Sequence, residues 1–226
     1  MDGEADKKNL TYCYCTLVLG EKYYRIGKAF LQTYVENVPG IKIIVVTDSE
    51  EELVTHEQVI TIPFRKNTPG HFISHKWLAY KEALNLGFST VCYIDADSIA
   101  KPEFNNEQIT SSIRDGLGCN WFLSYNKASN YRTRGAKKLQ NLMKPGDEYP
   151  IICPVECFMF LHGDKNRSLE FISEWEDICR EIVDKRMFHR EVCHEIGLAA
   201  KRTGVPVYKY PGGRRPYLDN FSHFGN

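Results

Sequence analysis

Residues 91–100 read Val-Cys-Tyr-Ile-Asp-Ala-Asp-Ser-Ile-Ala, an apolar run interrupted by two carboxylates. The four residues before Asp95 suffice for a buried strand, so we expect Asp95 and Asp97 at its carboxyl end. Open α/β sheets bind their ligands at that edge. Two hard oxygen ligands this close suit Mg²⁺ or Mn²⁺, which keep open positions for phosphate oxygens. The stretch predicts a metal site for a diphosphate; its alternative is a pair of ordinary turn aspartates.

Strand and helix patterns alternate on both sides of this stretch. Strand-like apolar runs occupy residues 10–19, 41–47, 59–64, 121–125 and 151–161, and helical spacing occupies residues 23–37, 75–86, 168–187 and 191–203. Such alternation is typical of βαβ units, so we expect an α/β fold with a mixed, mainly parallel sheet flanked by helices. A chain of 226 residues is long enough for one such domain over residues 1–226.

The remaining segments contain mostly turn, loop and polar residues. An acidic turn and a short helix are expected after Asp48, and a loop is expected over residues 65–70. The polar, basic residues 126–144 fit either an acceptor-facing loop or a solvated surface helix. Residues 211–226 are rich in Gly, Arg and aromatic residues, which indicates an ordered loop that wraps back over the protein without regular structure.

The composition excludes several classes of protein. Lys and Arg total 29, as do Asp and Glu, so no net charge favours nucleic acid as a partner. We expect no membrane span and a cytoplasmic location, because no segment approaches the roughly 20 apolar residues that cross a bilayer and the N-terminus lacks an apolar signal core. The eight cysteines lie mostly in apolar runs and lack the Cys-x-x-Cys spacing of zinc ribbons, so we expect reduced thiols.

Three further motifs follow one another along the chain. They are Thr16-Leu17-Val18 with Tyr24-x-x-Gly27, Lys76-Trp77 ahead of the stretch at 92–97, and His223-Phe224-Gly225. Their order resembles the GT-A-fold (Rossmann-like) glycosyltransferases, most closely glycosyltransferase family eight, which includes the glycogenins. The resemblance covers most of the chain. It implies a hexosyltransferase that moves a hexose from a UDP-sugar to an acceptor hydroxyl with retention of configuration.

The resemblance also implies roles for single residues. Asp95, Asp97 and His223 become ligands of Mn²⁺ (or Mg²⁺), and imidazole beside carboxylates favours Mn²⁺. Lys76 would face the leaving UDP. The implied donor-binding residues are Thr16, Leu17, Val18, Tyr24, Asp48 and Ala96, with Tyr24 beside the uracil ring. A core tyrosine, an exposed helix lysine and a tail histidine are the alternatives, and the family's His-x-x-Gly is shortened here to His-Phe-Gly.

At the catalytic centre the chain departs from the family. Family eight has an Asn-Ala-Gly type turn where this chain has residues 154–156, Pro-Val-Glu, and an Asp-Gln pair where it has residues 189–195, His-Arg-Glu-Val-Cys-His-Glu. We expect Glu191 or Glu195 near the anomeric carbon, and the residues do not decide between them. The alternative is that both are surface residues that pair at i, i+4. Glu156, a carboxylate in an apolar strand, predicts an acceptor contact or a general base, with a buried ion pair as the alternative.

The leading hypothesis is a metal-dependent glycosyltransferase that uses UDP-glucose or UDP-galactose and a glycan or protein acceptor. A non-catalytic domain that binds a sugar nucleotide or a glycan is one alternative, because the catalytic segments do not match the family. A phosphatase of the haloacid dehalogenase type is the other, since its strand also ends in Asp-x-Asp and a small hydroxyl residue. That enzyme needs a later acidic loop, which Gly163-Asp164 does not complete.

Overall fold

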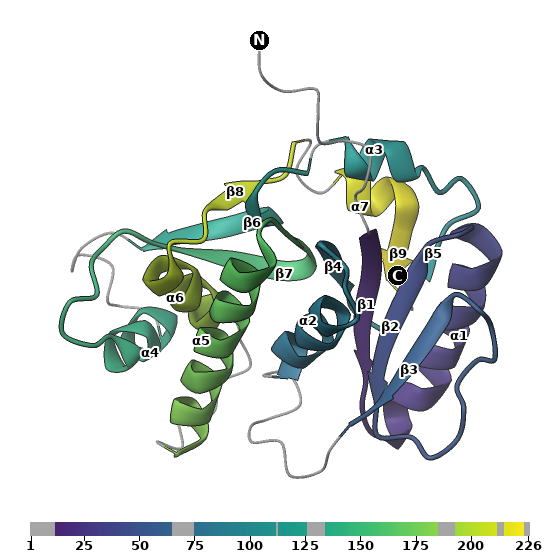
Figure 1. Cartoon of the computed structure of the whole chain (residues 1–226), viewed down its shortest axis with the longest axis horizontal. Helices are drawn as coiled ribbons and strands as arrows, with labels where there is room; N and C mark the ends of the chain where they lie inside the picture. The colour runs from purple at the N-terminus through teal and green to yellow at the C-terminus, as the bar shows by residue number, and fades with distance from the viewer. Residues whose placement is uncertain are drawn as a thin grey trace.

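A computed structural model of the chain describes residues 12–64, 75–111, 113–125, 134–184, 193–211 and 215–223. Its strands are β1 (Tyr12–Val18), β2 (Lys42–Thr47), β3 (Val59–Pro63), β4 (Thr90–Ile94), β5 (Ser98–Ala100), β6 (Gly116–Tyr125), β7 (Ile151–His162), β8 (Val207–Lys209) and β9 (Phe221–His223). Its helices are α1 (Glu21–Asn37), α2 (Lys76–Asn85), α3 (Asn106–Thr110), α4 (Arg134–Leu142), α5 (Lys165–Asp184), α6 (Cys193–Thr203) and α7 (Arg215–Asn220). Figure 1 shows their arrangement.

The central sheet is mixed and organised around β1. Within the described residues its strand order is β3-β2-β1-β4-β7-β6-β8. Strands β3, β2, β1 and β4 are parallel, whereas β7 runs antiparallel to both β4 and β6. The chain moves outward from β1 to β3 and then returns to β4 on the other side of β1. This reversal lies between β1 and β4, and open α/β sheets bind ligands beyond the carboxyl ends of the strands at such a point.

Alternating side chains of the strands build a core on each face of the sheet. On β1, Cys13 and Cys15 contact the cluster packed against α2, α5 and α6, whereas Tyr14 contacts the cluster packed against α1. Strands β2 and β4 alternate in the same way, as expected when both faces of a strand are covered. The helices therefore flank the sheet on both sides (Figure 1), and the expected α/β architecture is confirmed.

Close backbone contacts fix two of the helices on the sheet. A Cβ atom at Gly27 of α1 would lie 2.7 Å from Val18 Cγ1, so α1 approaches β1 as closely as a glycine permits. A Cβ atom at Gly197 of α6 would lie 2.6 Å from the main-chain oxygen of Ile152 on β7. Larger side chains at these positions would push the helices away from the sheet.

A second, smaller sheet lies beside the carboxyl end of β4. It consists of β5 and β9, which pair antiparallel although they come from the middle and the end of the chain. Phe221 of β9 is fully buried, and its ring contacts those of Tyr14, Phe158 and Tyr217. The aromatic residues of the C-terminal segment therefore serve to attach it to the core.

Two local expectations are wrong. Residues 48–58 form bends and a turn without a helix, because the Asp48 carboxylate accepts hydrogen bonds from Gly20 and Tyr24 and not from a following helical turn. Residues 211–226 are not purely a loop, because they include α7 and β9. Strand β9 is recognised only through its pairing with β5, more than 100 residues earlier in the sequence.

Several other features differ from or lie outside the sequence-based expectations. Strands β6 and β7 are longer than expected, and α3 and β8 were not anticipated. The surface-helix alternative holds for residues 134–142, which form α4. Residues 65–74, expected to begin with a loop, lie outside the described residues. Among the described helices, none combines the length and the apolarity that a bilayer-spanning segment requires.

Candidate functional site

Asp95, Ala96 and Asp97 form the turn between β4 and β5. The turn is closed by the main-chain N–H of Ser98, which donates to the Asp95 carbonyl oxygen at 3.1 Å. Ala96 is buried in the core against α1, while Asp95 and Asp97 on either side of it are partly exposed. The alanine thus anchors the turn, and the two carboxylates stand at the carboxyl end of β4, as the sequence predicts.

The pairing of β5 with β9 brings His223 to this turn. In the antiparallel register Ser98 lies opposite His223, so the backbone of His223 is the cross-strand neighbour of the residue that follows Asp97. Such paired residues have Cα atoms about 5 Å apart. The side chain of His223 lies outside the described residues, but its backbone stands next to the two aspartates.

Lys76 contacts Asp95 directly. Its Nζ lies 2.9 Å from Asp95 Oδ1 and 4.8 Å from the centroid of the Tyr93 ring, and the residue is only 7% exposed. Lys76 is also the first residue of α2, where a positive charge opposes the helix dipole. The carboxylate and the ring compensate for this unfavourable position and hold the ammonium group beside the aspartate turn.

Tyr24 and Asp48 meet beyond the ends of β1 and β2. Asp48 Oδ1 accepts hydrogen bonds from the Gly20 N–H at 2.8 Å and from the Tyr24 hydroxyl at 3.1 Å. Gly20 has a φ of 85°, which lets the chain turn sharply from β1 toward α1. Desolvation, followed by the hydrogen bond to Asp48, raises the pKa of Tyr24, which keeps this phenol in its neutral, donating form.

Residues 16–18 run along the end of β1 toward this contact. Thr16 is fully buried, and within the described structure its Oγ1 has no hydrogen-bond partner. Leu17 is partly exposed and Val18 is buried against Gly27. The expected donor-binding positions therefore lie on β1, in the first turns of α1, or just past the ends of β2 and β4. A direct contact of each with a ligand stays a prediction.

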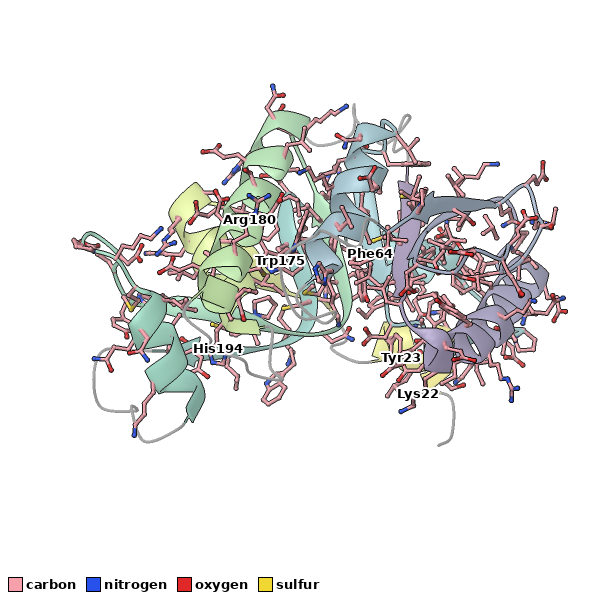
Figure 2. The ribbon with its side chains drawn as sticks, turned by 90° about the horizontal axis from the view of Figure 1, so that it is seen from below. Lys22, Tyr23, Phe64, Trp175, Arg180 and His194 are labelled. Carbon is pink, nitrogen blue, oxygen red and sulfur yellow. The ribbon has the colours of Figure 1, made fainter. Side chains whose placement is uncertain are left out.

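Glu195 occupies a different part of the fold. It is buried in the first turn of α6 beside His194, whose Nε2 lies 2.7 Å from the Tyr125 hydroxyl at the end of β6. Tyr125 pairs with Ile151 of β7, whereas Ile94, at the end of β4, pairs with Phe158 of β7. Ile151 and Phe158 are seven residues apart along β7. A straight strand would span about 23 Å over that stretch. Figure 2 likewise shows His194 and Tyr23 on opposite sides of the molecule.

The other expected catalytic residues are not fully described. Glu191 lies outside the described residues, and so does the side chain of Glu156. The backbone of β7 is described, and because Phe158 pairs with Ile94, Glu156 lies just past the carboxyl end of β4. Catalytic roles for these two residues and for Glu195 stay predictions.

Asn120 is a buried polar residue that is not among the site residues expected from the sequence. It lies on β6 between Cys119 and Trp121, where the register with β7 shifts. It is 6% exposed, and its Oδ1 has no hydrogen-bond partner in the described structure. The signal was present, because Asn120 is the one polar side chain in the run Leu117–Leu123.

The metal-ligand set is consistent in chemistry with a divalent ion. Carboxylate and imidazole are donors that Mn²⁺ accepts, and the fold brings Asp95, Asp97 and the backbone of His223 together. Among the side chains that the structure describes, no three His, Cys, Asp or Glu residues gather to form a metal site. The third expected ligand, the His223 imidazole, lies outside that set.

No protein-family model and no curated protein matches the sequence. Solved structures do match, among them a crystal structure of the galactosyltransferase LgtC in complex with donor and acceptor sugar analogs. It aligns with a TM-score of 0.51 over 87% of this chain and 72% of that chain, at 13% sequence identity. The chain has the GT-A fold. At this identity the likeness shows the GT-A architecture and nothing of the ligand.

Proposed function

We propose that the chain is a metal-dependent glycosyltransferase that moves a hexose from a UDP-sugar to an acceptor hydroxyl, with retention. The observation that carries the proposal is the aspartate turn at the end of β4, with His223 paired beside it through β9. The turn lies at the carboxyl end of β4, next to the strand reversal at β1. The GT-A fold adds support, because a galactosyltransferase with bound sugar analogs shares it.

The proposed roles follow the positions of the residues. Asp95, Asp97 and His223 hold Mn²⁺ or Mg²⁺, which neutralises charge on the diphosphate of the leaving UDP. Lys76 sits beside Asp95 and adds positive charge to the same place. The base and ribose lie over residues 16–18, Tyr24 and Asp48, at the ends of β1 and β2.

The acceptor side of the proposal rests on three carboxylates outside the metal-ligand set. Glu156 and Glu191 are the candidates for contacting the acceptor or the anomeric carbon, and Glu195, far along β7 from the aspartate turn, is a candidate for contacting the acceptor alone. UDP-glucose or UDP-galactose is the proposed donor, and a glycan or a protein is the proposed acceptor. A domain that binds the sugar nucleotide without turnover would use the same metal and base positions.

The test is calorimetric titration of UDP and UDP-glucose into metal-free protein, with and without Mn²⁺. We expect binding that requires Mn²⁺ and that disappears in Asp97→Asn. Asp177→Asn is the matched control, because Asp177 is an exposed carboxylate on α5. It should bind as the wild type does.

Failure of every UDP compound to bind, with or without Mn²⁺, would contradict the proposal. If binding occurs, the release of hexose from UDP-glucose and UDP-galactose, with water or a glycan as acceptor, separates an enzyme from a binding domain. A wild-type rate of sugar release no higher than that of Asp97→Asn would favour the binding domain.

A further inference from the structure

Asn220 connects the segment before β9 to the segment after β5. The residue is 1% exposed and is the last residue of α7. Its Oδ1 accepts a hydrogen bond from the main-chain N–H of Asn105, and its Nδ2 donates to Gln108 Oε1 at 3.1 Å. Its main-chain oxygen accepts from the N–H of Lys101 at 2.9 Å. Asn220 thus holds three separate residues of the stretch 101–108.

Neighbouring contacts strengthen the same connection. Gln108 Nε2 donates to Asp219 Oδ2 at 3.0 Å, and the Lys101 ammonium group donates to the Leu218 carbonyl oxygen. The hydroxyls of Ser98 and Tyr217 share a hydrogen bond of 3.0 Å. Helix α7 is therefore tied to both ends of β5.

The pairing that these contacts support is short. Strands β5 and β9 contribute three residues each, and an isolated ladder of that length is unstable in water. A slip of one residue would also move every side chain of β9 to the opposite face. An anchor immediately before β9 removes that freedom, because Asn220 directly precedes Phe221.

We propose that Asn220 is a positioning residue for the metal site: it fixes the register of β9 so that His223 stands beside Asp97 before any ion binds. The inference rests on the proposed function, because it takes His223 as a metal ligand. Asn220 does not touch the ion in this proposal. It acts through the backbone of β9, as outer residues of metal sites commonly act through the ligands.

The experiment measures the Mn²⁺ affinity of the UDP-bound protein by electron paramagnetic resonance, for the wild type and for Asn220→Ala. We expect the variant to bind Mn²⁺ about 10- to 100-fold more weakly, which is the usual effect of removing an outer positioning residue. Hydrogen exchange of the main-chain amides in β5 and β9 should become faster in the same variant.

Gln58→Ala is the matched control. Gln58 is also a buried carboxamide that holds backbone, since its Nε2 donates to the carbonyl oxygens of Val38 and Ile41. It connects the end of α1 to the start of β2, at the edge of the sheet opposite the aspartate turn. A variant that only lowers stability should therefore leave Mn²⁺ affinity at the wild-type value.

Gln108→Ala covers the case in which Asn220→Ala does not fold. Gln108 is exposed, so its removal disturbs the core little, yet it takes away one partner of Asn220 and the bond to Asp219. Its Mn²⁺ affinity should fall several-fold. If Asn220→Ala folds and binds Mn²⁺ with wild-type affinity, the inference is overturned. If Asn220→Ala does not fold, wild-type Mn²⁺ affinity in Gln108→Ala overturns it instead. Absence of Mn²⁺ binding by the wild type would instead remove the proposed function itself.

Discussion

At the scale of single residues, Lys76 and Asp95 show how the site is held before a ligand arrives. The ammonium group is buried at the start of α2, and the Asp95 side chain is 26% exposed. A lysine removed from water needs a partner, and this pair provides one. The ion pair therefore supports both the helix start and the aspartate turn.

We predict that Lys76→Met lowers the free energy of unfolding by about 1 kcal/mol, because the charge-assisted contact with Asp95 is lost. Removing the positive charge from the start of α2 also removes its repulsion by the helix dipole, which offsets part of the loss. Urea denaturation at pH 7 measures the change. Lys81→Met is the control: its Nζ pairs with Glu176 at 3.0 Å, but its side chain is 40% exposed, so its loss should cost less. A Lys76→Met protein at least as stable as the wild type would contradict this reading of the pair.

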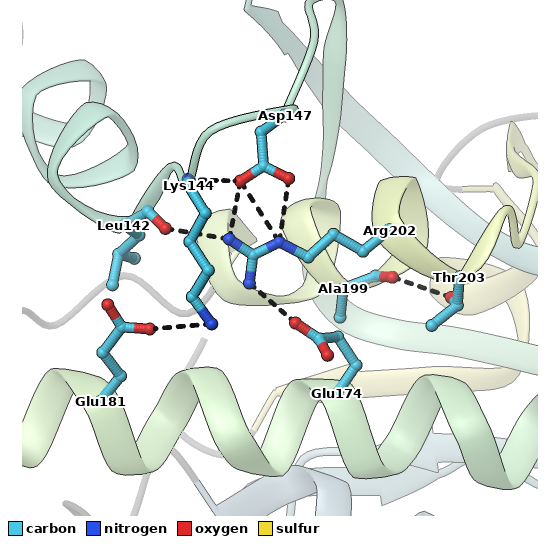
Figure 3. A network of polar contacts seen from close by, with 8 residues as sticks. All are labelled: Leu142, Lys144, Asp147, Glu174, Glu181, Ala199, Arg202 and Thr203. Carbon is cyan, nitrogen blue, oxygen red and sulfur yellow. Dashed lines mark hydrogen bonds and ion pairs between the residues drawn. The ribbon is translucent and has the colours of Figure 1, made fainter.

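At the scale of elements, a polar network joins α4, α5 and α6 (Figure 3). The Arg202 guanidinium of α6 donates to Asp147 at 2.7 Å, to Glu174 of α5 at 2.7 Å, and to the carbonyl oxygen of Leu142 at the end of α4. Both Arg202 and Asp147 are largely shielded from water. One arginine thus adds a polar connection among three helices whose apolar side chains share one core cluster.

This network predicts a pH dependence of stability. Burial by itself raises the pKa of Asp147, but hydrogen bonds from Arg202 and from the Lys144 N–H outweigh it, so the pKa is lowered in the folded protein. Above about pH 4 the carboxylate is charged in both states, and its contribution is complete. As the pH falls further the unfolded chain binds the proton first, so the contribution is lost toward the lowered pKa.

We therefore expect Asp147→Asn to lose about 2 kcal/mol of unfolding free energy at pH 7 and progressively less below pH 4. Urea denaturation at pH 7, 5 and 3 tests this, with Asp177→Asn as an exposed control that should show no such trend. An Asp147→Asn loss that is equal at all three pH values would show that the carboxylate charge is not what connects the helices.

At the scale of the whole molecule, the sheet and its two core layers remove the cysteines from water. Six cysteine side chains are described, and all are buried: Cys13, Cys15, Cys92, Cys119, Cys153 and Cys179. Burial raises the pKa of Cys119 to about 12 and that of Cys92 well above its ordinary value. The thiols of Cys92 and Cys119 are therefore neutral at physiological pH, and all six buried cysteines act as small apolar side chains.

We predict that these six cysteines are not alkylated by iodoacetamide at pH 8 in the native protein and are all alkylated in guanidinium chloride. Peptide mass spectrometry identifies each site separately. Cys13 reports on the packing between β1 and α2, and burial raises its pKa as well. Its rapid labelling in the native state would show that the layer between β1 and α2 opens, which the packing does not predict.

Much of the fold was predictable because its signals are local. The α/β alternation, the buried strand before Asp95 and the amphipathic helices follow from residue spacings within single elements. The apolar pattern predicts β7 to within one residue, but it predicts only the second half of β6, because Asn120 interrupts the apolar run. The α7–β9 segment has the composition of a loop, because three strand residues carry too little periodicity to indicate a strand.

By itself, the sequence determined that two carboxylates end a buried strand and that helices cover both faces of the sheet, because side-chain periodicity and burial are properties of neighbouring residues. Only the tertiary structure decided which distant residues join those carboxylates. The Ser98–His223 pairing, the Lys76–Asp95 ion pair and the Asn220 contacts depend on strand order and register. Asn105 and Asn220 lie 115 positions apart, and no local pattern specifies that they meet.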